Sequence, residues 1–216
     1  MFITPEELIE SLDISIHGII HVGACTAEEL PLYKEVGVER VIWIEANPQL
    51  AQHLSTRLMM EEGHTAFCFA ASDNSEGSSI LNITNNFQSS SILNLKKHKE
   101  IYPDITVVGK AEAPNLTLDD FIKIYGIDMS AYNFLNLDIQ GAELLALKGS
   151  AGILQDIDYI YTEVNEEELY EGCALIQDID DYLNSFSFKR VKTHIEKEKW
   201  GDAFYIKNQP PRTRFI

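Results

Sequence analysis

Two short apolar runs, separated by a helix-like segment, constrain the fold of this sequence more than any other feature. The first run ends at Gly23, and the second, Val41–Glu45, ends in an acid 22 residues after that glycine. A strand, a glycine turn, a helix and a parallel second strand form a βαβ unit, which binds nucleotide-like ligands at the carboxyl ends of its strands. An acid about 20 residues after the turn accepts hydrogen bonds from ribose hydroxyls in such units. We therefore expect Gly23 and Glu45 to hold a cofactor that contains adenosine.

Apolar strand-like and amphipathic helix-like segments alternate along most of the chain. The expected core strands are residues 16–22, 41–45, 65–70, 133–138 and 158–164, and the main expected helices are 26–36, 48–60, 117–125, 142–148 and 174–184. In the middle we expect an edge strand at 79–84, a polar loop at 85–91, a helix near 93–101 and a strand near 105–111. Alternation of this kind predicts a parallel sheet with helices on both faces.

The chain ends in two strand-like segments that no helix separates, near 186–193 and 203–207. Two consecutive strands joined without a crossover helix are antiparallel, so the last strand should oppose the others. The expected fold is α/β and Rossmann-like, with a seven-stranded, mostly parallel sheet. We expect one domain over residues 1–216, with an N-terminal helix in about 1–15 and a surface tail in about 208–216.

The composition restricts the partners of the protein. With 34 acidic and 17 basic residues, the formal net charge is −17, and such a surface repels nucleic acid and anionic membranes. Neutral, polar or cationic substrates fit better. No apolar run approaches the roughly 20 residues that span a bilayer, the first residues are acidic where a signal peptide is basic, and three scattered cysteines indicate reduced thiols in the cytoplasm. A homo-oligomer is compatible with the sequence.

Several motifs give the sequence a family resemblance over residues 16–207. They are His21-Val22-Gly23-Ala24, Trp43-Ile44-Glu45-Ala46-Asn47-Pro48, Ala71-Ser72-Asp73, Thr117-Leu118-Asp119, Leu137-Asp138-Ile139-Gln140-Gly141-Ala142-Glu143 and Glu163-Val164-Asn165. With these motifs the chain resembles the FkbM family of S-adenosylmethionine-dependent methyltransferases. The resemblance implies a class I methyltransferase fold, S-adenosylmethionine as cofactor, and methyl transfer to a hydroxyl of a sugar, a glycan or a secondary metabolite.

The expected cofactor contacts follow the ends of the strands. They come from His21, Gly23, Ala24, Glu45, Ala46, Ser72, Asp73 and Asp138. Ser72 and Asp73 would contact the adenine, or else form a turn before the next segment. Asp138 would hold the methionyl ammonium or act as the general base. His21 lies inside an apolar strand, where a packed histidine is the preferred interpretation.

The expected catalytic residues are Asp138, Glu163 and His194, and the expected acceptor contacts are Gln88, Ser89, Gln140, Asn165 and Trp200. A sugar hydroxyl is a poor nucleophile, so a carboxylate or imidazole that removes its proton assists the transfer. Oxygen ligands on two strand ends could also bind Mg²⁺, but a metal is not the favoured interpretation. Two alternatives remain: an NAD-dependent oxidoreductase, which shares the opening βαβ unit, and a non-catalytic methyltransferase-like binding module.

Overall fold

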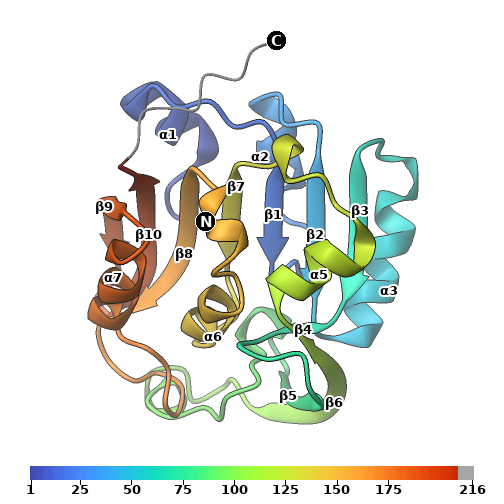
Figure 1. Ribbon diagram of the computed structural model, residues 1–216. Coiled ribbons are helices and arrows are strands. Elements are labelled where there is room, and N and C mark those ends of the chain that lie inside the picture. Colours follow the sequence, from blue (N-terminus) through green and yellow to red (C-terminus); the bar gives the residue numbers. More distant parts are fainter. Residues whose placement is uncertain (209–216) are drawn as a thin grey trace.

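A seven-stranded sheet forms the centre of the protein in a computed structural model that describes residues 1–208. In spatial order its strands are β3 (His64–Cys68), β2 (Val41–Glu45), β1 (Ile19–Val22), β7 (Phe134–Leu137), β8 (Tyr159–Asn165), β10 (Trp200–Lys207) and β9 (Phe188–Ile195). The first five pair in parallel, and β10 is antiparallel to both β8 and β9 (Figure 1). The predicted mostly parallel sheet with an antiparallel last strand is confirmed.

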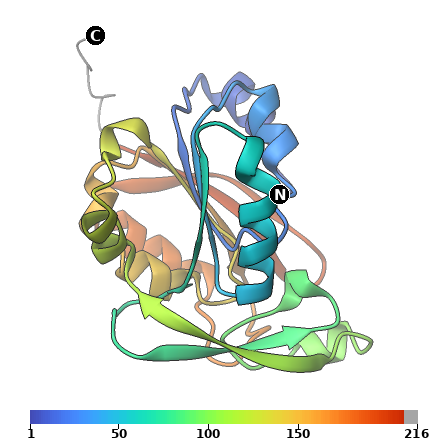
Figure 2. The same cartoon turned by 90° about the vertical axis from the view of Figure 1, so that its right-hand side faces the viewer.

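Helices cover both faces of this sheet (Figure 2). One face carries α1 (Pro5–Leu12), α2 (Leu30–Glu35) and α3 (Pro48–Arg57), and the other carries α5 (Leu118–Tyr125), α6 (Glu143–Lys148) and α7 (Ile176–Asn184). Short 3-10 turns occupy Leu58–Met60, Phe87–Ser89, Met129–Ala131 and Ile153–Gln155. Every residue of β1, β2 and β7 is buried, because both faces of these central strands are covered. That double burial explains their uninterrupted apolar runs.

Side-chain caps fix where three of the helices begin. The side chains of Thr4, Asn47 and Thr117 each accept a hydrogen bond from a backbone N–H in the first turn of α1, α3 and α5. These caps satisfy donors that a helix leaves unpaired at its start. The helix expected over 26–36 begins only at Leu30, since Pro31 has no N–H and must lie in the first turn.

The middle of the chain differs from the sequence-based prediction. The strand expected at 65–70 divides into β3 and a separate strand β4 (Ala70–Ala71), and the strand expected at 105–111 extends over β6 (Val107–Leu116). Strands β4 and β6 pair with β5 (Ser78–Thr84) in a second sheet of order β4-β6-β5. The strand β5, expected at an edge, is therefore not an edge of the main sheet. The small sheet crosses the carboxyl ends of the parallel strands (Figures 1 and 2).

Residues 86–105 connect β5 to β6, and we call them the roof segment. The residues that flank this segment are hydrogen-bonded to each other. The Asn85 N–H donates to the Thr106 carbonyl at 3.0 Å, and the Asn85 side-chain oxygen accepts from the Thr106 N–H at 2.9 Å. The segment contains the one-turn helix α4 (His98–Ile101). It is thus a closed loop held above the carboxyl edge of the main sheet.

The expected tail is described only at Asn208, so residues 209–216 lie outside the described part. Over residues 1–208, no helix has the length and apolar composition needed to cross a membrane.

Candidate active site

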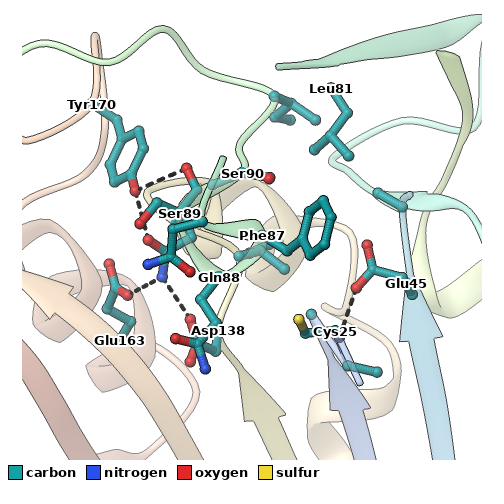
Figure 3. A pocket seen from close by; sticks show the side chains of 18 of the residues that line it. Cys25, Glu45, Leu81, Phe87, Gln88, Ser89, Ser90, Asp138, Glu163 and Tyr170 are labelled. Carbon is teal, nitrogen blue, oxygen red and sulfur yellow. Dashed lines mark hydrogen bonds between the residues drawn. The ribbon is translucent and has the colours of Figure 1, made fainter. Parts of the chain in front are cut away.

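A cavity of about 400 Å³ lies between the carboxyl ends of the strands and the roof segment (Figure 3). Its volume falls in the range of roughly 300–1,000 Å³ that is typical of small-molecule sites. The strand ends supply Gly23, Glu45, Asp138 and Glu163, and β10 supplies Asp202. Side chains that are far apart in the sequence therefore meet in one hollow, as expected for the carboxyl edge of an open α/β sheet.

Gly23 allows the loop after β1 to pass close to the end of β7. Its φ is +89°, and a Cβ at this position would lie 1.8 Å from the carbonyl oxygen of Asp138. Only glycine fits, because any side chain would overlap the neighbouring backbone. Two residues further on, the backbone of Cys25 also has a positive φ, of 44°, and turns its N–H toward Glu45.

Two backbone donors hold Glu45 at the carboxyl end of β2, and Figure 3 shows the one from Cys25. Its Oε2 accepts from the Cys25 N–H at 2.8 Å, and its Oε1 accepts from the Asn47 N–H at 2.7 Å. The residue is 8% exposed, and burial raises the pKa of its carboxyl group. An ionised carboxylate has about four acceptor positions, so each oxygen can accept a further hydrogen bond from a ligand.

Gln140 joins the acids at the ends of β7 and β8. Its amide nitrogen donates to Asp138 Oδ1 at 2.8 Å and to an oxygen of Glu163, and its amide oxygen accepts from the Tyr170 hydroxyl at 2.6 Å (Figure 3). Two carboxylate oxygens around one end of the amide identify that end as the NH₂ group. The Gln140 backbone has a φ of +56°, which non-glycine residues seldom adopt. The strained turn therefore places one side chain between two acids.

The acids in this network hold their protons more tightly than isolated carboxyl groups do. Burial, followed by the charge of Asp202, raises the pKa of Asp138 to about 6. Burial, followed by the charges of Asp138 and Glu143, raises the pKa of Glu163 well above its usual range. Glu143, whose Oε1 accepts from two backbone N–H groups in the loop before α6, has a pKa raised by burial to about 7. Burial and mutual repulsion therefore make Asp138 and Glu143 take up protons closer to neutral pH than isolated carboxyl groups do.

Most of the residues expected from the sequence line this one cavity. They are Gly23, Ala24, Glu45, Ala46, Gln88, Ser89, Asp138, Gln140, Glu163 and Trp200. Gln88 and Ser89 come from the roof segment, and Trp200 donates its Nε1–H to the Tyr102 hydroxyl at 3.0 Å.

His21 and His194 do not line the cavity. The His21 imidazole is buried in the core, where its Nδ1 lies 3.0 Å from the Tyr33 hydroxyl and its ring stacks on Trp43. Its position agrees with the packed histidine that we preferred and not with a side-chain contact to the cofactor. His194 lies on the outermost strand β9, with its Nε2 2.6 Å from Glu196 Oε1. It is therefore poorly placed to act as a general base.

Ser72, Asp73 and Asn165 also lie outside the cavity lining. Asp73 Oδ1 accepts from the side chain of Asn74 in the turn that follows β4, while Ala70 and Ala71 line the cavity in their place. The turn interpretation fits Asp73 better than adenine contact does. Asn165 is buried at the end of β8, two residues beyond Glu163, the residue of that strand that lines the cavity.

Among the lining residues that were not expected from the sequence are Met1, Phe2, Glu28, Glu29, His98, Tyr102, Tyr170 and Asp202. Asp202 had a recognisable signal, since it is a charged residue directly before the apolar run 203–206. It accepts from the Phe2 N–H at 2.6 Å and from the Tyr161 hydroxyl. Met1 and Phe2 had no such signal in the sequence, because their position depends on contacts with β10.

The acids at the strand ends do not form a metal site in the described part of the chain. No group of three metal-binding side chains is found there, and the NH₂ group of Gln140 lies between Asp138 and Glu163 where a shared cation would sit. An amide NH₂ is a donor and repels a cation. The residues present therefore do not fit Mg²⁺ at this position.

Comparison with known proteins identifies the family. The model of the methyltransferase FkbM domain matches residues 21–190, which is most of the chain. This chain belongs to the FkbM methyltransferase family. Among curated proteins, the FkbM chain is similar to 2-O-methyltransferase NoeI of Sinorhizobium fredii, with 33% identity over 98 residues. That match covers 45% of this chain and 40% of NoeI, so it spans less than half of either protein.

Solved structures show the same fold at low sequence identity. A SAM-dependent methyltransferase from Aquifex aeolicus superposes with a TM-score of 0.51 at 11% identity, covering 94% of this FkbM chain and 88% of the other. Streptococcus pneumoniae Sp1610, described as a putative tRNA (m1A22) methyltransferase in complex with S-adenosyl-L-methionine, gives 0.52 at 12% identity, covering 94% and 72%. The expected class I methyltransferase fold and the FkbM resemblance are confirmed.

Proposed function

We propose that this FkbM-family protein is an S-adenosylmethionine-dependent O-methyltransferase that acts on a hydroxyl of a sugar, a glycan or a secondary metabolite. One observation carries the proposal: Glu45, held by two backbone donors, and Asp138, held by Gln140, line the same cavity at the carboxyl edge. In this proposal the Glu45 carboxylate binds the ribose hydroxyls and the Asp138 carboxylate takes the proton of the acceptor. The proposal rests on these two side chains in one cavity, because a shared fold alone does not establish a function.

The residues present fit S-adenosylmethionine. Glu45 has acceptor positions free for the two ribose hydroxyls, and Ala70 and Ala71 offer an apolar surface for the adenine beside β4. The many lining carboxylates favour a cationic sulfonium over a neutral or anionic ligand. When bound, the cofactor supplies an electrophilic methyl group to the acceptor oxygen.

Asp138 is the proposed general base. A pKa of about 6 leaves its carboxylate mostly ionised at neutral pH while keeping it basic enough to take the proton that the acceptor hydroxyl loses. Gln140 orients the Asp138 carboxylate and donates to Glu163 as well, whose pKa burial and the neighbouring charges raise well above its usual range. Holding base and acceptor in one geometry supplies much of the rate in reactions of this kind.

The acceptor and the compartment are part of the proposal. NoeI is described as a 2-O-methyltransferase, and this likeness supports oxygen as the methylated atom. Gln88 and Ser89 present uncharged polar groups, and Trp200 an aromatic ring, as sugar-binding sites do. A cavity without lysine or arginine among its described lining residues suits a small-molecule or glycan acceptor better than nucleic acid. The three free cysteines fit the reducing cytoplasm.

Calorimetry with the purified protein tests the cofactor. We expect S-adenosylmethionine and S-adenosylhomocysteine to bind, and we expect Glu45→Ala to weaken both by about tenfold or more, since it removes hydrogen bonds to a charged group. Glu62→Gln, at an exposed position before β3 on the opposite edge of the sheet, is the matched control and should bind normally. Tighter binding of NAD than of S-adenosylhomocysteine would instead support an oxidoreductase, and unchanged affinity of the Glu45 variant would refute the ribose assignment.

A further inference from the structure

We propose that Phe87 stacks on the adenine of S-adenosylmethionine, so that the roof segment helps to hold the cofactor against the main sheet. This inference rests on the proposed function and adds a cofactor contact from outside the strand ends. Two observations support it. The Phe87 ring contacts no other aromatic ring of the described residues, and it lies on the side of the cavity where Glu45 is found.

Phe87 differs from the other aromatic side chains of the cavity. Six such side chains line it, and they are Phe2, Phe87, His98, Tyr102, Tyr170 and Trp200. All of them except Phe87 contact another aromatic ring of this set, with ring centroids 5.0 Å or 5.4 Å apart. Within residues 1–208 no ring contacts Phe87, and its side chain is 52% exposed although it lines the cavity. The faces of this ring are therefore available to a ligand.

The backbone that carries Phe87 is fixed on both sides of the residue. The Phe87 carbonyl accepts from the Ser90 N–H at 3.1 Å, and the Ser90 hydroxyl oxygen accepts from the Thr84 N–H at 3.2 Å, which ties the 3-10 turn to the end of β5. The next side chain, that of Gln88, donates its amide N–H to Glu28 in the loop after β1. These bonds hold the turn in place, so the exposure of the ring does not come from a loose loop.

The position of the ring fits the base of the cofactor. In Figure 3 the Phe87 ring points toward Leu81 and Glu45 and away from the acids at the ends of β7 and β8. On this side the lining is apolar, because it consists of Leu81 and of Ala70 and Ala71 in β4, which are all buried. Adenine is bonded to the ribose whose hydroxyls Glu45 is proposed to bind, so the base must lie close to this carboxylate. A purine that enters here meets apolar side chains and one free aromatic ring, which suit its flat faces.

A sugar acceptor could also stack on an aromatic face, but its place in the cavity is a different one. The hydroxyl that receives the methyl group must lie at the proposed base Asp138, whereas the Phe87 ring lies on the Glu45 side (Figure 3). Stacking of a base on an aromatic side chain changes affinity by about tenfold. Loss of the ring should therefore be visible in the binding of the cofactor itself, without any acceptor.

Calorimetry with S-adenosylhomocysteine tests the inference on three variants. We expect Phe87→Ala to weaken binding by about tenfold and Phe87→Tyr, which keeps the ring, to bind within about twofold of the wild type. Val108→Ala is the matched control, because Val108 is an apolar residue of β6 that is 63% exposed and does not line the cavity. Wild-type affinity in Phe87→Ala would overturn the inference. An equal loss in the Val108 variant would overturn it too, because the effect would then not come from the cavity.

An NMR measurement locates the contact on the cofactor. In wild-type protein labelled with carbon-13 on its phenylalanine rings, the adenine H2 or H8 of bound S-adenosylhomocysteine should show nuclear Overhauser contacts to one ring, and these should disappear in Phe87→Tyr, whose new ring is unlabelled. Contacts that persist in this variant, contacts to the homocysteine part alone, or no contacts at all would overturn the inference. Failure of the wild type to bind S-adenosylhomocysteine would instead refute the proposed function, which separates the two outcomes.

Discussion

Changing Asp138 to asparagine should alter the pH dependence of stability in a defined direction. Burial and the charge of Asp202 raise the pKa of Asp138 from 3.8 to about 6. The folded protein therefore binds this proton more tightly than the unfolded chain does. The corresponding stabilisation is complete below about pH 4 and is lost as the pH rises through about 6. A shift of about two units corresponds to about 3 kcal/mol.

The Asp138→Asn side chain is uncharged at every pH, but the oxygen of its amide can still accept from Gln140, so the variant isolates the charge. The acids that interact electrostatically with Asp138 from neighbouring elements are Glu29, Glu143, Glu163 and Asp202. We therefore expect the variant to gain about 1 to 3 kcal/mol relative to the wild type between about pH 4.5 and 7.5. Urea unfolding at several pH values, followed by circular dichroism, measures this difference.

The matched control is Glu62→Gln, which removes an exposed carboxylate far from the cavity and should leave the difference from wild type independent of pH. Parallel stability curves for the wild type and Asp138→Asn would refute the reasoning. A variant that loses stability relative to the wild type as the pH rises would refute it as well, because the sign would then be that of an acid with a lowered pKa.

Three further substitutions test two contacts at the site and one at the amino ends of the central strands. Gly23→Ala should destabilise the fold by at least about 2 kcal/mol, since its Cβ would lie 1.8 Å from the Asp138 carbonyl oxygen; thermal unfolding measures the loss. Tyr170→Phe removes the donor to the Gln140 amide oxygen and should cost about 1–2 kcal/mol in urea unfolding, with the far-ultraviolet spectrum unchanged. Asn133→Ala deletes a buried amide that bonds two backbone groups before β1, at 2.9 Å each, and should cost about 2–4 kcal/mol; a cost below about 1 kcal/mol would contradict this.

The central sheet could be predicted from the sequence because its signals are local. The strands β1, β2 and β7 are buried on both faces and read as continuous apolar runs, and Thr4, Asn47 and Thr117 mark helix starts with their side chains. The end of each parallel strand is also recognisable, so Glu45 and Asp138 could be assigned to one edge before any coordinates were known.

The small sheet and the hydrogen bonds of the site could not be predicted in the same way. Strands β5 and β6 have half-exposed residues, and nothing local shows that they pair with each other and not with the main sheet. Gln140 was expected to bind the acceptor, but its amide nitrogen is bonded to Asp138 and Glu163. Such a contact depends on the distance between two strand ends, which a single sequence does not contain.

The expected start of the last strand explains why Asp202 was missed. The charged stretch before it suggested a turn as far as Trp200, whereas β10 already begins at that residue. Asp202 thereby pairs with Glu163 and enters the cavity. Pairing with two neighbouring strands extends β10 over residues whose composition favours a turn, which is a tertiary effect on secondary structure.

The closed base of the roof segment separates two parts of the molecule that could evolve independently. Nine lining residues lie between the paired residues Asn85 and Thr106, whereas Glu45 and Asp138 belong to the main sheet. Because the two ends of the segment are joined, a stretch of different length or composition could be transplanted there without disturbing the pairing of β5 with β6. Exchange of this single loop between relatives would change the lining above the main sheet while Glu45 and the proposed base Asp138 stay in place.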